Sequence, residues 1–147
     1  MVGLSVERMV ELEAFHTDLE RVGDFERLMQ TVAAEPHYEL QPAGYALTSR
    51  IAVETFYRRC MPTFFGMVAR SAPQMIRTYG ENVMIQESRG PLVFPDGVER
   101  FSTRVTVIAF EGELIKGERG YADQHMGALI AELVGPDFAS VPGVVRL

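Results

Sequence analysis

The apolar residues change their spacing once along this chain, near Pro73. Before Pro73 they recur every three or four residues, which is typical of amphipathic helices. After it, residues 83–87, 100–110 and 114–123 are rich in apolar and β-branched residues and are separated by turn signals, which is typical of antiparallel strands. Helices in one half and meandering strands in the other predict an α+β domain, with the helices on one face of a curved sheet.

The first half of the chain is expected to form helices joined by short connections. The first helix covers residues 5–22, and Gly23 ends it. Asp24 is a preferred N-cap residue, so a second helix starts there and ends at Pro36. Residues 37–41 then alternate in polarity, which predicts a short strand.

A third helix should follow the turn after this strand. Thr48 is the expected N-cap, and Ile51, Phe56 and Tyr57 are candidates for the buried side. Pro62 should kink or divide the helix, because its ring removes a backbone donor and crowds the preceding turn.

The domain is expected to end with a helix over residues 124–134, which Gly135 terminates. A chain of 147 residues, 47% of them hydrophobic, is sufficient for one domain with its own core. We therefore expect a single domain over residues 1–135 and a C-terminal tail over 136–147, either mobile or docked on a neighbour. The one cysteine, Cys60, excludes an internal disulfide.

Charge and hydropathy exclude several function classes. The net charge is −6 with acidic and basic residues interspersed, which argues against nucleic-acid binding. There is no run of about 18 apolar residues to span a membrane. Residues 1–21 lack the apolar core of a secretion signal, so we expect a cytoplasmic protein. His16, His37 and His125 are far apart in sequence, so no metal site or cofactor is predicted.

Four stretches of the sequence, in this order and spacing, resemble one known family. They are Gly23-Asp24-Phe25, residues 42–57, residues 80–83 and residues 110–135. Through them the chain resembles the nuclear transport factor 2-like superfamily, and within it the SnoaL-like branch of polyketide cyclases and ketosteroid isomerases. The superfamily includes isomerases, cyclases, hydrolases, dehydratases, adaptors and proteins that only bind, so the likeness is specific for a fold and not for a function.

The resemblance implies a particular shape and assembly. The shape is a cone, also called cystatin-like, in which a curved antiparallel sheet packs on three N-terminal helices. A small hydrophobic pocket opens at the wide end, and the outer face of the sheet forms a homodimer.

Asp123 and His16 are the candidate catalytic residues. Asp123 resembles the acid/base aspartate of SnoaL-like cyclases, and an apolar pocket would raise its pKa toward neutrality. The alternatives are an N-cap of the following helix or an ion pair with Arg119. His16 lies in the apolar stripe of the first helix and resembles in position the carbonyl-polarising tyrosine of ketosteroid isomerases. Its alternative is a core histidine bound to a backbone carbonyl.

Further residues are candidates for contact with a substrate. Arg119 and Tyr121 share a strand face with Asp123 if the alternation holds. Tyr38 and Tyr57 offer hydroxyl groups, although simple packing is the alternative for every tyrosine.

Two departures from the family pattern limit the chemistry. Gln41 stands before Pro42, where ketosteroid isomerases have their general-base aspartate, and Thr106 stands where they have a protonated aspartate. Arg104 resembles the arginine of limonene epoxide hydrolases, but Thr106 replaces the aspartate that accompanies it. Gln41 and Arg104 therefore remain candidates for substrate binding rather than for proton transfer.

Three functions remain open from the sequence. The first is a cofactor-free enzyme that performs cyclase, isomerase or hydrolase chemistry on a small hydrophobic ring compound. The second is a protein that binds such a molecule without chemistry, and the third is a dimeric adaptor. The positions of His16 and Asp123 relative to one cavity would distinguish them.

Overall fold

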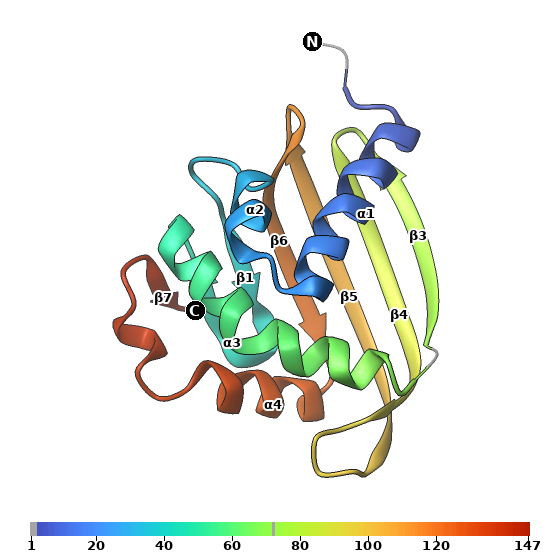
Figure 1. The fold of residues 1–147 in the computed structure, drawn as a ribbon, viewed down its shortest axis with the longest axis vertical. Helices are drawn as coiled ribbons and strands as arrows, with labels where there is room; N and C mark the ends of the chain where they lie inside the picture. The colour runs from blue at the N-terminus through green and yellow to red at the C-terminus, as the bar shows by residue number, and fades with distance from the viewer. Residues whose placement is uncertain (1–2, 72) are drawn as a thin grey trace.

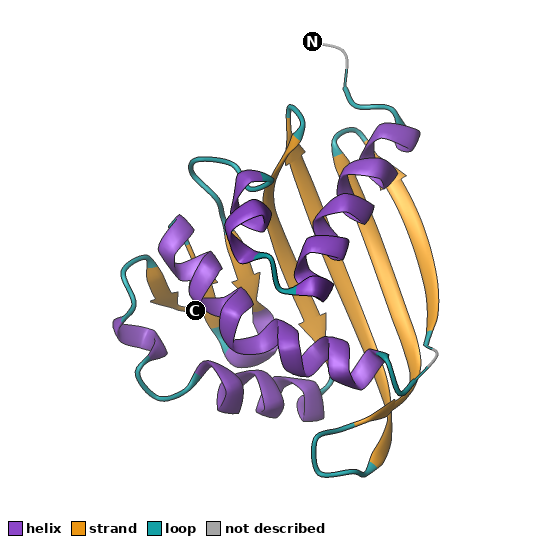
Figure 2. Ribbon diagram, viewed as in Figure 1, coloured by secondary structure: helices purple, strands orange, loops and turns teal. Residues whose placement is uncertain are grey.

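In the computed structural model, which describes residues 3–71 and 73–147, helices cover one face of a curved sheet (Figures 1 and 2). The α+β prediction is therefore confirmed, and so are the three N-terminal helices. None of the described helices combines the length and the apolar character needed to cross a bilayer. The helices are α1 (Val6–Val22), α2 (Phe25–Gln30), α3 (Arg50–Val68) and α4 (Gln124–Val134), with short 3-10 helices at Gln41–Ala43 and Phe138–Ser140.

The sheet has seven strands in the order β3-β4-β5-β6-β1-β2-β7. Its strands are mostly antiparallel, as expected, but β1 runs parallel to β6, so the sheet is mixed. The strands are β1 (Tyr38–Leu40), β2 (Tyr45–Leu47), β3 (Gln74–Gly80), β4 (Val83–Val93), β5 (Glu99–Glu111), β6 (Leu114–Ala122) and β7 (Val144–Arg146).

The first two helices have the caps that the sequence indicates, but α2 is shorter than predicted. Gly23 ends α1 in the left-handed conformation, and Asp24 accepts a hydrogen bond from Arg27 N–H at the start of α2. The second helix ends at Gln30 instead of Pro36. The reason is that Val32 forms a parallel bridge with Ile115, and this pairing replaces further helical turns.

The third helix differs from its prediction in three details. Its N-cap is Ser49, since Thr48 donates its hydroxyl to the carbonyl of Gly143. Pro62 does not divide the helix. Ile51 is 59% exposed and is not on the buried side.

Three strands were not anticipated by the sequence pattern. The edge strand β3 is mostly exposed, so it lacks the alternation that identifies a strand, and β2 is only three residues long. The segment 136–147, which we expected to be a tail outside the domain, contributes β7, which pairs with β2. Phe138 from the same segment is fully buried and stacks edge-on against Tyr45.

A glycine in β6 allows the parallel pairing with β1. A Cβ atom built on Gly117 would lie 1.8 Å from the carbonyl oxygen of His37. The backbone at His37, directly before β1, therefore approaches β6 more closely than any side chain would allow.

We predict that Gly117→Ala lowers the free energy of unfolding by at least about 2 kcal/mol, because the added methyl group would clash with backbone rather than with a flexible side chain. Gly66→Ala is the matched control, since Gly66 is exposed on α3 and its added Cβ meets no atom within 4 Å. The control should be neutral or stabilising by up to about 1 kcal/mol. Urea unfolding of both variants measures the difference, and equal stabilities would contradict the close approach.

A second prediction concerns residues 136–147. Phe138→Ala should destabilise the protein by about 3–5 kcal/mol, as expected for loss of a buried aromatic ring. Leu147→Ala, at a side chain that is 62% exposed, should change stability by less than about 0.5 kcal/mol. If both variants unfold at the wild-type urea concentration, the segment does not stabilise the domain.

Candidate functional site

A cavity of about 480 Å³ lies between the concave face of the sheet and helices α1, α3 and α4. This volume is within the range of small-molecule sites. Its sheet side is built from three rows of residues paired across β4, β5 and β6. The rows are Ser88–Arg104–Ala122, Gln86–Thr106–Gly120 and Met84–Ile108–Glu118, of which Met84 does not itself line the cavity.

The helical wall of the cavity is mainly apolar. Since α3 turns one side toward the sheet, its aromatic and methionine side chains face the cavity, and α4 adds two more apolar residues. These residues are Phe56, Met61, Phe64, Phe65, Met126 and Ile130. Such a wall suits a hydrophobic ligand and leaves orientation to the few polar groups.

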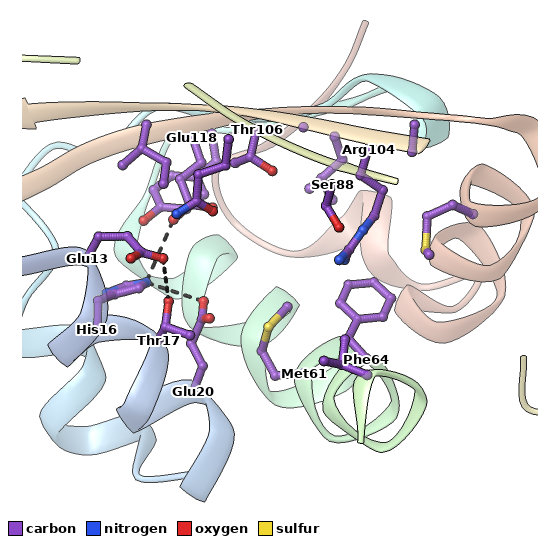
Figure 3. Close-up of a pocket in the computed structure, with 18 of the residues that line it drawn as sticks. Glu13, His16, Thr17, Glu20, Met61, Phe64, Ser88, Arg104, Thr106 and Glu118 are labelled. Carbon is purple, nitrogen blue, oxygen red and sulfur yellow. Dashed lines mark hydrogen bonds and ion pairs between the residues drawn. The ribbon is translucent and has the colours of Figure 1, made fainter. Parts of the chain in front are cut away.

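One polar cluster lines the cavity between α1 and β6. His16 and Glu20 lie one turn apart on α1, and Glu118 faces them from β6 (Figure 3). The Nε2 atom of His16 lies 3.3 Å from Oε1 of Glu20 and 3.8 Å from Oε1 of Glu118. His16 is 2% exposed, whereas the two glutamate side chains are 12% and 20% exposed. The carboxylates therefore meet a ligand first, with the imidazole behind them.

Hydrogen bonds fix the orientation of the His16 ring. The Thr31 hydroxyl donates to the Leu28 carbonyl, so its oxygen accepts from Nδ1–H of His16 at 2.6 Å. Nε2 then faces the hydroxyl of Tyr57 at 2.9 Å, and Tyr57 is bonded to the hydroxyl of Tyr38. Because Tyr57 donates to Tyr38, its oxygen accepts from Nε2–H when His16 is protonated. Since Thr31 holds the proton on Nδ1, Nε2 is the ring nitrogen that gains or loses a proton.

The pKa values of Glu118, His16 and the two tyrosines depart from their usual values. Burial raises the pKa of Glu118 to about 7, the charge of Glu20 adds to this shift, and His16 opposes it. Burial disfavours the charged form of His16, but its hydrogen bond with Glu20 and the nearby negative charges outweigh burial, so the pKa of His16 is raised. Burial raises the pKa of Tyr38 and Tyr57 well above the usual value, so both keep their protons.

The same three residues have the spacing of a metal site. One donor atom from each of His16, Glu20 and Glu118 lies within 4.8 Å of the others, which is close enough for a divalent cation. Sequence reasoning considered only the spacing of histidines and did not consider the two carboxylates.

The structure brings some of the predicted site residues together. His16, Tyr57, Tyr38, Arg104 and Tyr121 line the cavity, although Tyr121 is 43% exposed.

Two residues that were predicted to contact a substrate lie outside the cavity. Arg119 is exposed and does not line the cavity, because Glu118, Gly120 and Ala122 are the residues that β6 turns inward. Gln41 is also exposed and donates its side-chain amide to Glu39.

Asp123 is the N-cap of α4 and does not line the cavity. One of its carboxylate oxygens accepts from the N–H groups of His125 and Met126, and the other accepts from Ser102 Oγ and Thr103 N–H. Burial would raise the pKa of Asp123, but these hydrogen bonds outweigh burial and lower it. Of the roles considered for Asp123, the geometry matches the cap.

Glu118 and Glu20 were missed for different reasons. Glu20 was visible as a carboxylate four residues after His16 on one helix face. Glu118 was missed because the cavity side of the strand was inferred from Asp123, which predicts that Arg119 and Tyr121 face inward. Asp123 lies beyond the end of β6 and caps α4, so it does not indicate which side of the strand faces the cavity.

No protein-family model and no curated protein matches the sequence. Solved structures do match it in fold. An NTF2-like protein from Burkholderia xenovorans has a TM-score of 0.63 at 14% identity, over 88% of this chain and 99% of the other. A proposed SnoaL-like polyketide cyclase from Shewanella putrefaciens has a TM-score of 0.62 at 11% identity, over 87% of this chain and 88% of the other.

A third structure, a bacterial protein with a cystatin-like fold from Silicibacter pomeroyi, has a TM-score of 0.66 at 13% identity over 91% of this chain and 94% of the other. The chain therefore has the nuclear transport factor 2-like fold that its sequence resembles. Identities this low establish the fold alone, so function has to be argued from the residues of the cavity.

The capping role of Asp123 leads to a prediction. Asp123→Ala should destabilise the protein by about 1–2 kcal/mol at neutral pH, whereas Asp123→Asn should retain most of the stability, because asparagine also caps helices. Since the pKa of Asp123 is lowered by folding, its ionised form stabilises the fold above the ordinary aspartate pKa. The advantage of wild type over Asp123→Ala should therefore shrink as the pH falls through the lowered pKa. Urea unfolding across this acid range would contradict the cap if the difference stayed constant.

Proposed function

We propose that this protein is a cofactor-independent acid/base enzyme that acts on a small hydrophobic ring compound, by isomerase, cyclase or hydrolase-type chemistry. One observation carries the proposal: Glu20 and Glu118 flank His16 in a cavity whose α3 and α4 wall is apolar. A carboxyl group with a pKa of about 7, as for Glu118, can both accept and donate a proton near neutral pH.

The proposed step is the movement of a proton within the ligand. Ionised Glu118 takes a proton from a carbon beside a carbonyl group, and the electron pair of the C–H bond moves toward the carbonyl oxygen. Glu20 or Glu118 returns a proton at a second position, and His16 exchanges protons between the two carboxylates. The ligand gains and loses one proton, so the step balances without an oxidant or a reductant.

The two tyrosines support this arrangement from behind. Tyr57 and Tyr38 keep their protons and form a hydrogen-bonded pair that ends at His16 Nε2. We assign them a positioning role, since both are fully buried or nearly so. Gln41 and Thr106 stand at the positions of the ketosteroid isomerase aspartates, so the proposal relies on Glu118 and His16 instead.

The alternative function is a protein that binds the same kind of molecule without chemistry. Its support is the mainly apolar wall and the engagement of both His16 nitrogens with hydroxyl groups. A homodimer and a cytoplasmic location also stay predictions. The outer face of the sheet exposes Ile85 and Phe101, at 37% and 69%, which suits a dimer interface.

Deuterium exchange into ketones tests the enzyme proposal. The protein, with and without EDTA, is incubated in deuterated buffer with cyclohexanone and β-tetralone, and NMR follows exchange at the carbon beside the carbonyl. Wild type should accelerate exchange of at least one ketone, and Glu118→Gln should slow it by at least about 100-fold, because the proton acceptor is removed. Glu99→Gln, at an exposed residue of β5, is the matched control.

Each of the other outcomes contradicts a different part of the proposal. Exchange at the buffer rate for every ketone contradicts acid/base catalysis and favours the binding protein. Loss of exchange in EDTA contradicts the cofactor-independent mechanism and favours a metal at His16, Glu20 and Glu118. If Asp123→Asn loses exchange while Glu118→Gln retains it, Asp123 carries the proton.

A further inference from the structure

Arg104 places a positive charge in the cavity, away from the acidic cluster. It lies on β5, paired with Ser88 on one side and Ala122 on the other. Its guanidinium points into the cavity near Ser88 and Phe64 (Figure 3). Arginine is rarely placed in such an apolar site without a partner, because burying its charge is costly.

The part of the chain that the structure describes offers this charge no directly bonded partner. Across residues 3–71 and 73–147, Arg104 makes no ion pair and no side-chain hydrogen bond, whereas Arg77, Arg89 and Arg100 on the same sheet each pair with a carboxylate. The charges of Asp123 and Glu20 act on Arg104 without direct contact. One oxygen of Asp123 is occupied by the cap of α4, and the other accepts from Ser102 and Thr103. Burial lowers the pKa of Arg104 from its usual value, in agreement with a charge that lacks close compensation.

We propose that Arg104 binds a carboxylate of the ligand, so that the substrate of this cavity is a hydrophobic ring acid. This inference rests on the proposed function and specifies its substrate class. A guanidinium presents two parallel N–H donors that match the two oxygens of a carboxylate. Ser88, whose side chain is buried beside Arg104 in the same row, adds a hydroxyl group.

The opposite charges in the cavity then orient the ligand. The row of Arg104 and the row of Glu118 are four residues apart on β6, between Ala122 and Glu118, or roughly 13 Å at the usual strand rise. Glu20 and Glu118 repel a carboxylate, and Arg104 attracts it. The acid group of the ligand therefore lies at Arg104, and its ring extends over Thr106 and Gly120 toward the proton-transfer cluster.

A matched pair of probes tests this inference by isothermal titration calorimetry. Naphthalene-carboxylate and naphthalene-carboxamide have the same shape and differ in charge. The wild-type protein should bind the carboxylate at least about tenfold more tightly, as expected for a charge-assisted hydrogen-bonded pair in a partly buried site. Arg104→Met should remove this preference and keep the affinity for the amide, since methionine preserves the apolar wall.

The control is Arg89→Met, at a residue adjacent to Ser88 that is exposed and does not line the cavity. It should keep the full preference for the carboxylate. Circular dichroism checks that each variant folds, and Arg104→Lys, which keeps the charge but loses the paired donors, should bind the carboxylate more weakly than wild type.

The remaining outcomes overturn the inference in distinguishable ways. Equal affinity for the two probes in the wild-type protein overturns it and leaves the ketone-exchange proposal intact, and this comparison needs no variant. A carboxylate preference that survives in Arg104→Met also overturns it. If neither probe binds, the cavity is not a site for ring compounds, and the proposed function fails together with the inference.

Discussion

The close approach of His37 to Gly117 positions most of the candidate site. Because Gly117 has no side chain, the backbone before β1 can lie against β6 and pair with it in parallel. The residues that follow these two in sequence are Tyr38 and Glu118, so one backbone contact places a buried hydroxyl and a buried carboxyl group on the same side of the molecule. The link from Tyr38 through Tyr57 to His16 then joins β1, α3 and α1 around the cavity.

Holding three ionisable groups in one apolar cavity has a cost in stability. The folded state keeps Glu118 protonated to a higher pH than an exposed glutamate would be, because its pKa is raised to about 7. The folded state therefore binds more protons than the unfolded state between the ordinary carboxyl range and neutrality, and this contribution to stability is lost as the pH rises through about 7. Perturbed groups of this kind concentrate at functional sites, although structural ion pairs also produce them.

Sequence reasoning succeeded where one local pattern decides the structure. The helical spacing before Gly23, the caps at Asp24 and the end of α4 at Gly135 depend on neighbouring residues, and these were predicted. It failed where pairing between residues distant in sequence decides the structure. Val32 pairs with Ile115, so α2 is shorter than predicted, and β7 forms by pairing with β2. In the site, His16 was found because a polar residue on an apolar stripe is conspicuous. Glu118 was missed because the cavity side of β6 was inferred from Asp123, which caps α4 instead of facing the cavity.

The alternation of residues along β5 limits the insertions that this strand can accept. Neighbouring residues of a strand face opposite sides of the sheet, so the cavity side of β5 consists of alternate residues, including Arg104, Thr106 and Ile108. Inserting one residue within β5 would turn those side chains to the outer face and bring their neighbours inward, whereas inserting two would move the same set along the cavity. The length of this strand can therefore change by one residue only where a bulge absorbs the extra residue, as in the register shift between Ala109 and Phe110.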